Sequence, residues 1–272
     1  MADITVESLS HVYSEGTPFR RVAIEDINIS IPHGQLVGII GHTGSGKSTF
    51  TQHLNALLQP TTGRVLVGGQ DINADKISRR NVKWQVGLVF QYPEHQLFEE
   101  TVYQDIAFGP RNMKLSDSEV DERVREAAYF VGVDEKLFDG SPLELSGGQK
   151  KRVFLARAIA QQGEVILLDE PFTGVDVKTE ARIISLLREL RDEGKTMLVS
   201  THNLGSVTEF CDYTVMVKGT VLASGPTETT FTAENLERAF SGVLRHVVLS
   251  GSEDRIITDD ERPFVTHRQE AK

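Results

Sequence analysis

A glycine-rich segment near the start of the chain constrains its fold more than any other feature. Residues 41–49 read GHTGSGKST, which fits the phosphate-binding loop pattern G-x-x-x-x-G-K-[ST]. The apolar run 35–40 predicts a strand before this loop, and residues 48–58 predict a helix after it. Glycines let several backbone N–H groups point at phosphate oxygens, and the helix N-terminus adds a partial positive charge. The segment therefore predicts a nucleotide-phosphate site between a strand and a helix.

The side chains of the loop have expected parts in that site. The Lys47 ammonium is expected on the β- and γ-phosphates, and the Ser48 hydroxyl on a Mg²⁺ ion. Glycine-rich turns also precede helices in proteins that bind no nucleotide, but the Lys-Ser pair and the strand favour the phosphate site. The expected nucleotide-binding residues of the loop are Gly41, His42, Thr43, Gly44, Ser45, Gly46, Lys47, Ser48 and Thr49.

The composition is typical of a globular protein. It argues against a protein that binds nucleic acid over a broad surface and against one stabilised by internal disulfide bonds. Of its 272 residues, 39% are hydrophobic and 25% charged, and the single cysteine, Cys211, excludes an internal disulfide. A net charge of −10 disfavours a broad nucleic-acid surface. No apolar run approaches the about 18 residues that a membrane helix needs. We expect a cytosolic chain that reaches a membrane only through partners.

The order of periodic segments predicts an α/β fold. Short runs at 4–8, 24–31 and 35–40 alternate apolar and polar residues, as half-buried antiparallel strands do. The pattern becomes helical between about 101 and 162, and from 165 onward strands alternate with helices, which indicates a parallel sheet. We therefore expect one domain over 1–240, a parallel core sheet with an antiparallel β subdomain, and an inserted helical subdomain near 92–145. The extension 241–272 is expected to be partly disordered.

A second nucleotide signal lies at residues 165–170, which read VILLDE. Four apolar residues predict a buried strand with Asp169 at its carboxyl end, the edge where parallel sheets bind ligands. Asp169 is expected to hold Mg²⁺ through water, and Glu170 to polarise a water aimed at the γ-phosphate. The alternative is that both acids only cap the following helix, which the phosphate-binding loop upstream makes less favourable.

A third signal lies at residues 145–149, which read LSGGQ. Adjacent glycines at a helix start supply exposed N–H groups beside a hydroxyl, and together these form an anion site. Because the phosphate-binding loop already holds the nucleotide of its own chain, this site is expected to contact the nucleotide of a second copy in a head-to-tail dimer. The expected residues are Ser146, Gly147, Gly148 and Gln149.

These motifs, with Gln91 after VGLVF and His202 after LVST, occur in an order that resembles the ATP-binding subunit of an ABC transporter over about residues 4–240. The resemblance implies a P-loop NTPase of the ABC ATPase type that hydrolyses ATP with Mg²⁺. It also implies a dimer, homomeric or heteromeric, docked on a transmembrane transporter subunit at the cytoplasmic face of the cell membrane.

The resemblance also implies roles for single residues. Tyr13 resembles the aromatic that stacks on adenine, and Phe19 is a weaker candidate for that role. Gln91 resembles the glutamine that reaches Mg²⁺ and the attacking water, His202 the residue that contacts the γ-phosphate, and Asp176 part of the loop that crosses the dimer interface. A lone aromatic, glutamine or histidine is more often structural, which is the alternative for each.

Two halves of the chain point to different relatives within the family. Residues up to about 150 resemble an energy-coupling-factor ATPase, a subunit of transporters that take up vitamins or metal ions, whereas residues from about 154 resemble the ATPase of a manganese/iron importer. A chimera with a seam near 150–154 is the favoured explanation, and a natural divergent member is the alternative. Because the helical subdomain contacts the membrane subunit in this family, we expect an energy-coupling-factor partner.

Other functions remain as alternatives. One is the ATPase of a manganese/iron importer, and another is a chimera that binds ATP without any role in transport. A soluble ABC ATPase that acts on DNA is disfavoured, because only about 100 residues separate the phosphate-binding loop from LSGGQ. One that acts on ribosomes is disfavoured because the chain has one ATPase cassette.

Overall fold

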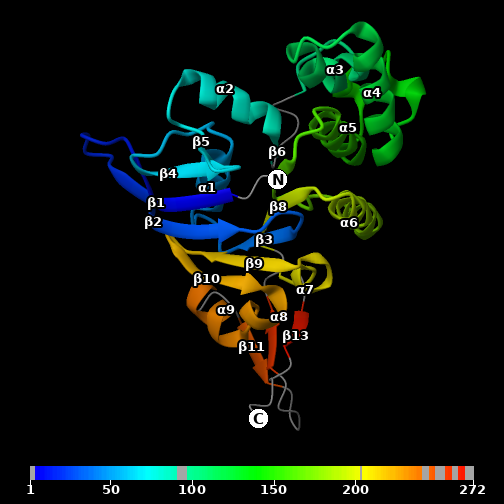
Figure 1. Cartoon of the computed structure of the whole chain (residues 1–272). Coiled ribbons are helices and arrows are strands. Elements are labelled where there is room, and N and C mark those ends of the chain that lie inside the picture. The colour runs from blue at the N-terminus through cyan, green and yellow to red at the C-terminus, as the bar shows by residue number, and fades with distance from the viewer. Residues whose placement is uncertain are drawn as a thin grey trace.

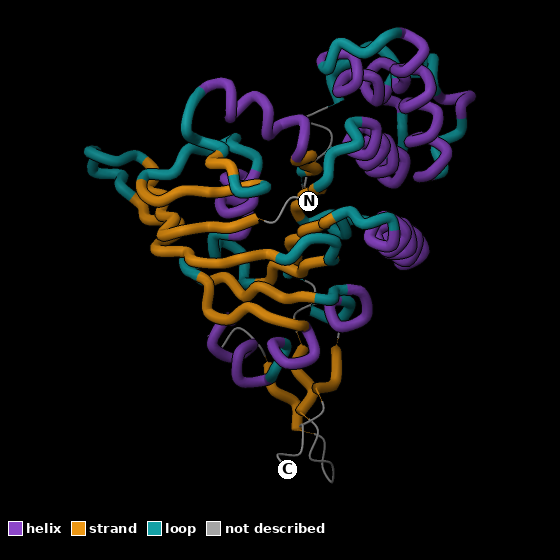
Figure 2. The backbone as a smooth tube through the Cα atoms, in the orientation of Figure 1, coloured by secondary structure: helices purple, strands orange, loops and turns teal. Residues whose placement is uncertain are grey.

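The computed structural model describes residues 4–90, 97–202 and 204–240, together with the backbone of three short strands beyond residue 244 (Figure 1). Helices and strands alternate after the first antiparallel sheet, and the inserted helices stand apart from the sheets at the upper right of Figure 2. The expected α/β fold, with a parallel core sheet, an antiparallel β subdomain and a helical insertion, is confirmed.

The first sheet is antiparallel and has the strand order β2-β1-β4-β5. Its strands are β1 (Ile4–Tyr13), β2 (Arg21–Ile31), β4 (Thr62–Val67) and β5 (Gln70–Asp71). Alternate residues of β1 and β2 enter the core, as the apolar-polar alternation predicts. Register shifts in the β1–β2 pairing bend the end of β1, where Tyr13 pairs with Arg21.

The core sheet has the strand order β10-β9-β3-β8-β7-β6 and is parallel except for β10. Its strands are β3 (Leu36–Ile40), β6 (Val86–Val89), β7 (Val165–Asp169), β8 (Thr196–Thr201), β9 (Tyr213–Val217) and β10 (Val221–Pro226). The expectation that residues 35–40 form a half-buried antiparallel strand was wrong, since β3 is parallel and buried on both faces. Its polar neighbour Gln35 lies outside the strand, and the strand itself is a continuous apolar run.

Two hydrophobic cores lie on opposite faces of this sheet. Val37 and Ile39 pack with β1, β2 and α1 (Lys47–Leu54), whereas Leu36 and Ile40 pack with the helices of the other face. That face carries α5 (Gly147–Ala160), α6 (Val177–Asp192) and α7 (Val207–Phe210). Because alternate residues of β3 enter the two cores, the loop at 41–46, which follows this strand, lies at the carboxyl edge of the sheet between them.

The helical insertion consists of α3 (Val102–Asn112), α4 (Asp117–Val131), two short 3-10 helices and the start of α5. Thr101 and Ser116 cap α3 and α4, and Gly132 ends α4 in the left-handed conformation. The expected bounds of the subdomain, near 92–145, stay a prediction, and residues 91–96 lie outside the described residues.

Several elements were not expected from the sequence. Helix α2 (Lys76–Gln85) begins at Asp75, whose side chain accepts hydrogen bonds from two backbone N–H groups. Helices α8 (Thr227–Thr230) and α9 (Ala233–Phe240) follow β10. Beyond them, β11 (Arg245–Val248), β12 (Arg255–Thr258) and β13 (Pro263–Thr266) pair antiparallel, and the expected partial disorder of 241–272 stays a prediction. Across the described residues, no helix has the length and hydropathy to cross a membrane.

Candidate nucleotide site

The loop between β3 and α1 has a backbone that only glycine accommodates at its last position. Gly46 lies at φ 100°, and a Cβ atom there would be 2.7 Å from Ile24 Cγ2 and 2.9 Å from the Ala23 carbonyl oxygen. Gly46 also precedes α1 without any side-chain cap. The first N–H groups of α1 therefore have no capping side chain, and this helix start can bind an anion.

Lys47 is buried inside the loop that precedes it. Its Nζ donates hydrogen bonds to the carbonyl oxygens of Gly41 at 2.7 Å and His42 at 3.3 Å, and lies 3.5 Å from Glu170 Oε1. Burial lowers the pKa of Lys47, and the nearby Glu170 carboxylate partly offsets that effect. A buried ammonium with a single carboxylate partner can exchange that partner for phosphate oxygens.

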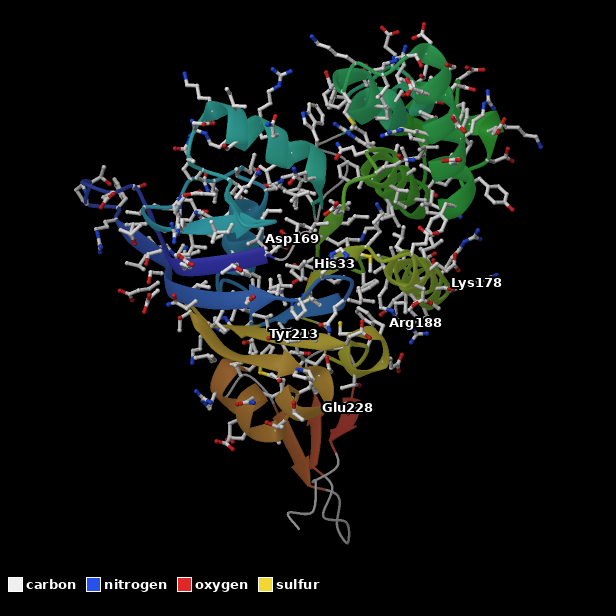
Figure 3. All side chains as sticks on the ribbon, viewed as in Figure 1. His33, Asp169, Lys178, Arg188, Tyr213 and Glu228 are labelled. Atoms are coloured by element: carbon white, nitrogen blue, oxygen red, sulfur yellow. The ribbon has the colours of Figure 1, made fainter. Side chains whose placement is uncertain are left out.

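Asp169 ends β7 and Glu170 follows it at the carboxyl edge of the core sheet, and Figure 3 shows Asp169 near the middle of the molecule. Ser200 of β8 connects the two acids, because its hydroxyl donates to Asp169 Oδ1 at 2.5 Å and accepts from the Glu170 backbone N–H at 3.1 Å. Ser200 was not identified from the sequence, where a serine inside a buried apolar run carries no signal beyond its place two residues before His202.

His202 lies directly beside Glu170. Its Nδ1 is 2.8 Å from Glu170 Oε2, and its backbone N–H donates to the same oxygen at 3.4 Å. Glu170 therefore contacts Lys47 through one carboxylate oxygen and His202 through the other. The structure brings together Lys47, Asp169, Glu170 and His202, all of which the sequence analysis selected.

A pocket of about 200 Å³ opens beside the loop, between β1, β2 and α1. Its lining residues are Tyr13, Arg21, Val22, Ala23, Gly44, Gly46, Lys47, Ser48 and Thr49. The Tyr13 hydroxyl is 3.2 Å from Thr49 Oγ1, whereas Phe19 is 82% exposed and does not line the pocket. Arg21, the first residue of β2, is a pocket residue that sequence reasoning missed, since an arginine there belongs to no motif.

The loop has the features that a nucleoside triphosphate with a metal ion requires. Ser45 Oγ is buried and has no hydrogen-bond partner among the described residues, and Ser48 is exposed at the pocket. Gly44 and Gly46 both have positive φ angles, which turn successive backbone N–H groups toward one side. Polar atoms without partners, a hydroxyl for a hard cation and a buried ammonium match the donor set of such a ligand.

The segment 145–149 forms the start of α5 and stands apart from this pocket, because none of its residues is among the lining residues. Ser146 caps the helix: its hydroxyl accepts from the Gln149 N–H at 3.4 Å, and the Gln149 side chain accepts from the Ser146 N–H at 2.8 Å. Gly147 has open space where a side chain would lie, and Gly148 has only Thr179 Oγ1 nearby.

Two further expected residues have different outcomes. Asp176 caps α6, since it accepts from the Thr179 N–H and from the Thr179 hydroxyl, and the latter bond is the main reason that its pKa is lowered. Gln91 lies outside the described residues, so its expected contacts with Mg²⁺ and water stay a prediction.

The pocket beside the phosphate-binding loop is smaller than a second cavity in the protein. A cavity of about 480 Å³ lies between α4, the end of α5 and the end of α6, and contains none of the motif residues. We identify the site by its chemistry, because the smaller pocket holds the ammonium, the hydroxyls and the uncapped helix start.

Comparisons with known proteins agree with this geometry. A model of the ABC transporter family matches residues 24–173. The chain is 50% identical over 239 residues to the energy-coupling factor transporter ATP-binding protein EcfA2 of Caldanaerobacter subterraneus subsp. tengcongensis, covering 86% of this chain and 83% of the relative. It is 47% identical over 249 residues to EcfA2 of Symbiobacterium thermophilum, covering 91% and 86%.

Solved structures show the same similarity. The structure of cbiO1 from Clostridium perfringens, part of the ABC transporter complex cbiONQ, superposes with a TM-score of 0.75 at 37% identity, covering 86% of this chain and 92% of that one. The ATP-binding cassette MJ0796, in a dimeric post-hydrolysis state bound to ADP and Pi, has a TM-score of 0.75 at 30% identity, covering 82% and 98%.

These comparisons do not support the expected change of relative near residues 150–154. An alignment over 86% of the chain necessarily includes both sides of that seam, so the same energy-coupling factor relatives match both halves. The part of the chain from about residue 154, which resembles a manganese/iron importer, contains Asp169, Glu170 and His202, and these lie together at the carboxyl edge of the core sheet. Because the chemistry at this edge restricts which residue types can occupy it, the sequence there is a poor guide to the type of relative and to whether the chain is a chimera.

Proposed function

The chain belongs to the ABC transporter family and, within it, to the energy-coupling factor transporter ATP-binding proteins, and from this membership we propose how its site hydrolyses ATP to power uptake. The proposal rests on two contacts at the carboxyl edge of the core sheet: Lys47 lies beside one oxygen of the Glu170 carboxylate, and His202 lies beside the other. An ammonium for phosphate oxygens and a carboxylate oriented by a histidine are the groups that phosphoryl transfer to water needs.

The phosphate-binding loop binds and orients the substrate. Backbone N–H groups of the loop and the Lys47 ammonium bind the phosphate oxygens of ATP, and Lys47 then exchanges its contact with Glu170 for the γ-phosphate. Ser48, Asp169 and Gln91 are the residues that would hold Mg²⁺, directly or through water. When bound, the ion neutralises charge that develops on the phosphates. The exposed Ser48 hydroxyl and the buried Asp169 carboxylate support this assignment.

Glu170 is the group that acts on the attacking water. Its backbone N–H is fixed by Ser200 and one carboxylate oxygen by His202, so the other oxygen is free to accept a proton once Lys47 turns to the phosphate. His202 orients that carboxylate and lies beside it at the edge where the γ-phosphate would bind. Tyr13 supplies an aromatic surface for the adenine base at the rim of the pocket.

The competent unit in this proposal is a dimer. The helix start at Ser146 and Gly147 lies outside the nucleotide pocket of its own chain and has open space at Gly147, which suits the nucleotide of a second ATPase subunit. MJ0796 is a dimer in its post-hydrolysis structure, which supports a paired arrangement here. Asp176, at the start of α6, belongs to the same interface.

The membrane partner is a transmembrane subunit of an energy-coupling factor transporter, contacted through the helical subdomain. The transporter takes up vitamins or metal ions, and the ATPase binds peripherally at the cytoplasmic face. Phe98, which is 58% exposed beside the segment 91–96, is an apolar anchor for a partner helix. EcfA2 proteins of several bacteria are 44–50% identical to this chain, which favours this partner over a metal-importer permease.

Coexpression followed by affinity purification tests the proposal. The tagged chain is coexpressed with an energy-coupling factor transmembrane subunit or with a manganese/iron permease, and ATPase activity of the recovered material is measured. We expect recovery and ATP hydrolysis with the first partner only. Recovery with the metal permease alone would overturn the assignment of the partner.

A pair of exposed aromatics provides the matched control. Phe98→Ala should reduce recovery of the membrane subunit, whereas Tyr129→Ala, which changes an 88% exposed aromatic on α4, should not. Equal losses for both variants would show that the docking surface is not at Phe98.

A further inference from the structure

Two histidines that no step above uses lie behind Tyr13. His53 of α1 is fully buried, and its imidazole is 4.7 Å from that of His11, centroid to centroid. The His11 ring in turn lies 4.5 Å from the Tyr13 ring in an edge-to-face arrangement, with 79° between the ring planes. A buried histidine is costly to desolvate unless its ring nitrogens have hydrogen-bond partners.

The hydrogen bonds fix the tautomer of each ring. His53 Nδ1 is 2.7 Å from the Thr49 carbonyl oxygen, which only accepts, so Nδ1 carries the proton and Nε2 of the neutral ring is an acceptor. His11 Nδ1 lies 3.1 Å from the Gln59 carbonyl oxygen and 3.2 Å from His53 Nε2. Since both of these atoms accept, His11 Nδ1 carries a proton and shares it between them.

His53 stays neutral at the pH of a cell. Its pKa is lowered to about 4, chiefly by burial and to a smaller extent by the facing His11, against the effect of its hydrogen bond to Thr49. A proton on His53 Nε2 would also face the N–H of His11, so two donors would oppose each other. The acceptor that His11 needs is therefore permanently present.

These contacts close a ring of interactions around the start of α1. Tyr13 contacts Thr49 through its hydroxyl, Thr49 accepts from His53, His53 accepts from His11, and His11 packs against Tyr13. The end of β1 is also tied to the segment after α1, because the Val12 N–H donates to Thr61 Oγ1 at 3.0 Å. The Tyr13 ring is thus held from behind while 38% of the residue remains exposed at the pocket.

We propose that His11 and His53 are positioning residues for the nucleotide base: they hold the ring of Tyr13 in the orientation that receives adenine and tie it to the helix that carries Lys47. The inference rests on the proposed role of Tyr13. It assigns to the pair a part in affinity for the base, and none in contact with the phosphates or in the chemical step.

Comparing two ligands separates this role from general support of the fold. Binding of ATP and of inorganic tripolyphosphate, each with Mg²⁺, is measured by calorimetry for the full chain and for the variants His11→Ala, His53→Leu and Tyr13→Ala. We expect His11→Ala and His53→Leu to weaken ATP binding by about five- to tenfold, within the range of stacking on an aromatic, and to leave tripolyphosphate binding unchanged. In the assembled transporter, KM for ATP should rise while kcat at saturating ATP is retained.

A conservative variant tests the hydrogen-bonding logic. His53→Gln can still donate to Thr49 and accept from His11, so it should restore most of the ATP affinity that His53→Leu loses. Because His53 is fully buried and its variants can fail to fold, His11→Ala at a half-buried position keeps the test open.

The outcomes distinguish this inference from the proposed function. If Tyr13→Ala weakens ATP binding and the histidine variants do not, the pair has no positioning role and the aromatic platform stands. Equal weakening of ATP and tripolyphosphate by the histidine variants would show that the pair supports the loop and would overturn the inference. If Tyr13→Ala leaves ATP binding unchanged, the platform assignment and the inference fail together, while hydrolysis by Lys47 and Glu170 remains.

Discussion

Glu170 has a backbone φ of 50°, a conformation that residues other than glycine rarely adopt. The strain is held by Ser200, whose carbonyl oxygen and hydroxyl both accept from the Glu170 N–H at 3.1 Å. This conformation turns the carboxylate back between Lys47 and His202. Strained backbone at a catalytic position persists only where the surrounding structure holds it, as the buried strand β8 does here.

Replacing Glu170 by glutamine tests its assignment as the group that acts on water. Glu170→Gln keeps a polar side chain beside His202 but removes the basic oxygen, so turnover should fall by about 10²-fold or more while ATP still binds. An ATP-bound dimer should accumulate, because closure persists when hydrolysis stalls. Phosphate release and size-exclusion chromatography measure the two effects. Glu228→Gln, at an exposed glutamate on α8, is the control, and unchanged turnover in Glu170→Gln would contradict the assignment.

A second residue-scale prediction concerns the strand that leads into the loop. A Cβ atom on Gly38 would be 2.9 Å from Cys211 Sγ and 3.4 Å from Val207 Cγ1, so Gly38→Ala should destabilise the fold by about 1–3 kcal/mol. Removing the sulfur in Gly38→Ala/Cys211→Ala should recover part of this loss. Urea unfolding of the single and double variants measures it, and an additive double variant would show that the two positions do not compete for space.

Among the elements, α3 and α5 are joined by a charged pair inside the helical subdomain. Asp105 of α3 is fully buried, and Arg157 Nη1 of α5 lies 3.5 Å from its Oδ1. The Arg157 guanidinium also packs over the rings of Phe98, Phe108 and Phe154, at 5.0, 4.6 and 5.9 Å from their centroids. Burial raises the pKa of Asp105 to about 6 although Arg157 opposes the shift, so the carboxylate is charged at pH 7.5 beside Arg157.

Removing that partner should therefore destabilise the protein in a pH-dependent way. Arg157→Met leaves a buried, unpaired carboxylate at pH 7.5, which should cost about 3–5 kcal/mol of unfolding free energy. The folded pKa of Asp105 lies above its unfolded value, so Asp105 is protonated in the folded variant at pH 5, and the loss should shrink there. Urea unfolding of Arg157→Met and of Arg157→Met/Asp105→Asn at both pH values checks this. A loss that is equal at pH 5 and pH 7.5 would assign the effect to the lost phenylalanine contacts instead.

For the whole molecule, the two hydrophobic cores meet at the core sheet, and the nucleotide site lies at the edge that they share. Tyr13, Lys47 and Ser48 come from the side of β1 and α1, and Asp169 and Glu170 lie at the carboxyl end of β7 between the two cores. Helix α5 belongs to the other core, and its first glycines are not among the residues that line the pocket. A single chain therefore presents two incomplete halves, which a head-to-tail dimer would join.

Mixing two inactive variants tests whether sites are shared between chains. Ser146→Arg should block the surface offered to the partner, and Lys47→Ala should abolish phosphate binding in its own chain, so each homodimer should be inactive. In a mixed dimer one site carries both lesions and the other carries neither, and activity should reappear at about a quarter of the parent value if the chains mix at random and the sites act independently. Phosphate release from the mixture measures it. No recovery, with mixed dimers demonstrated by two affinity tags, would argue against shared sites.

The sequence determined the parts of this protein that depend on local spacing. The order glycine-rich loop, lysine, helix fixes a phosphate site because only glycine fits at Gly46, and the apolar run before Asp169 fixes a buried strand ending in acids. Motif order was also sufficient for the ABC ATPase fold. The expected seam near residue 150 was not supported, because the same relatives align with both sides of it. The sequence around the edge that carries the acids reflects the chemistry of that edge more than the type of relative.

Contacts between residues far apart in the chain were decided only by the tertiary structure. The link from Ser200 to Asp169 and Glu170, the contact of Lys47 with Glu170, and the His11–His53 pair beside Tyr13 join residues between 30 and 123 positions apart in sequence. Helix α2 and the full burial of β3 likewise follow from what packs against them. Periodicity records which residues face a core, but parallel strands bring their carboxyl ends together only once the sheet has formed, and that closure assembles the site.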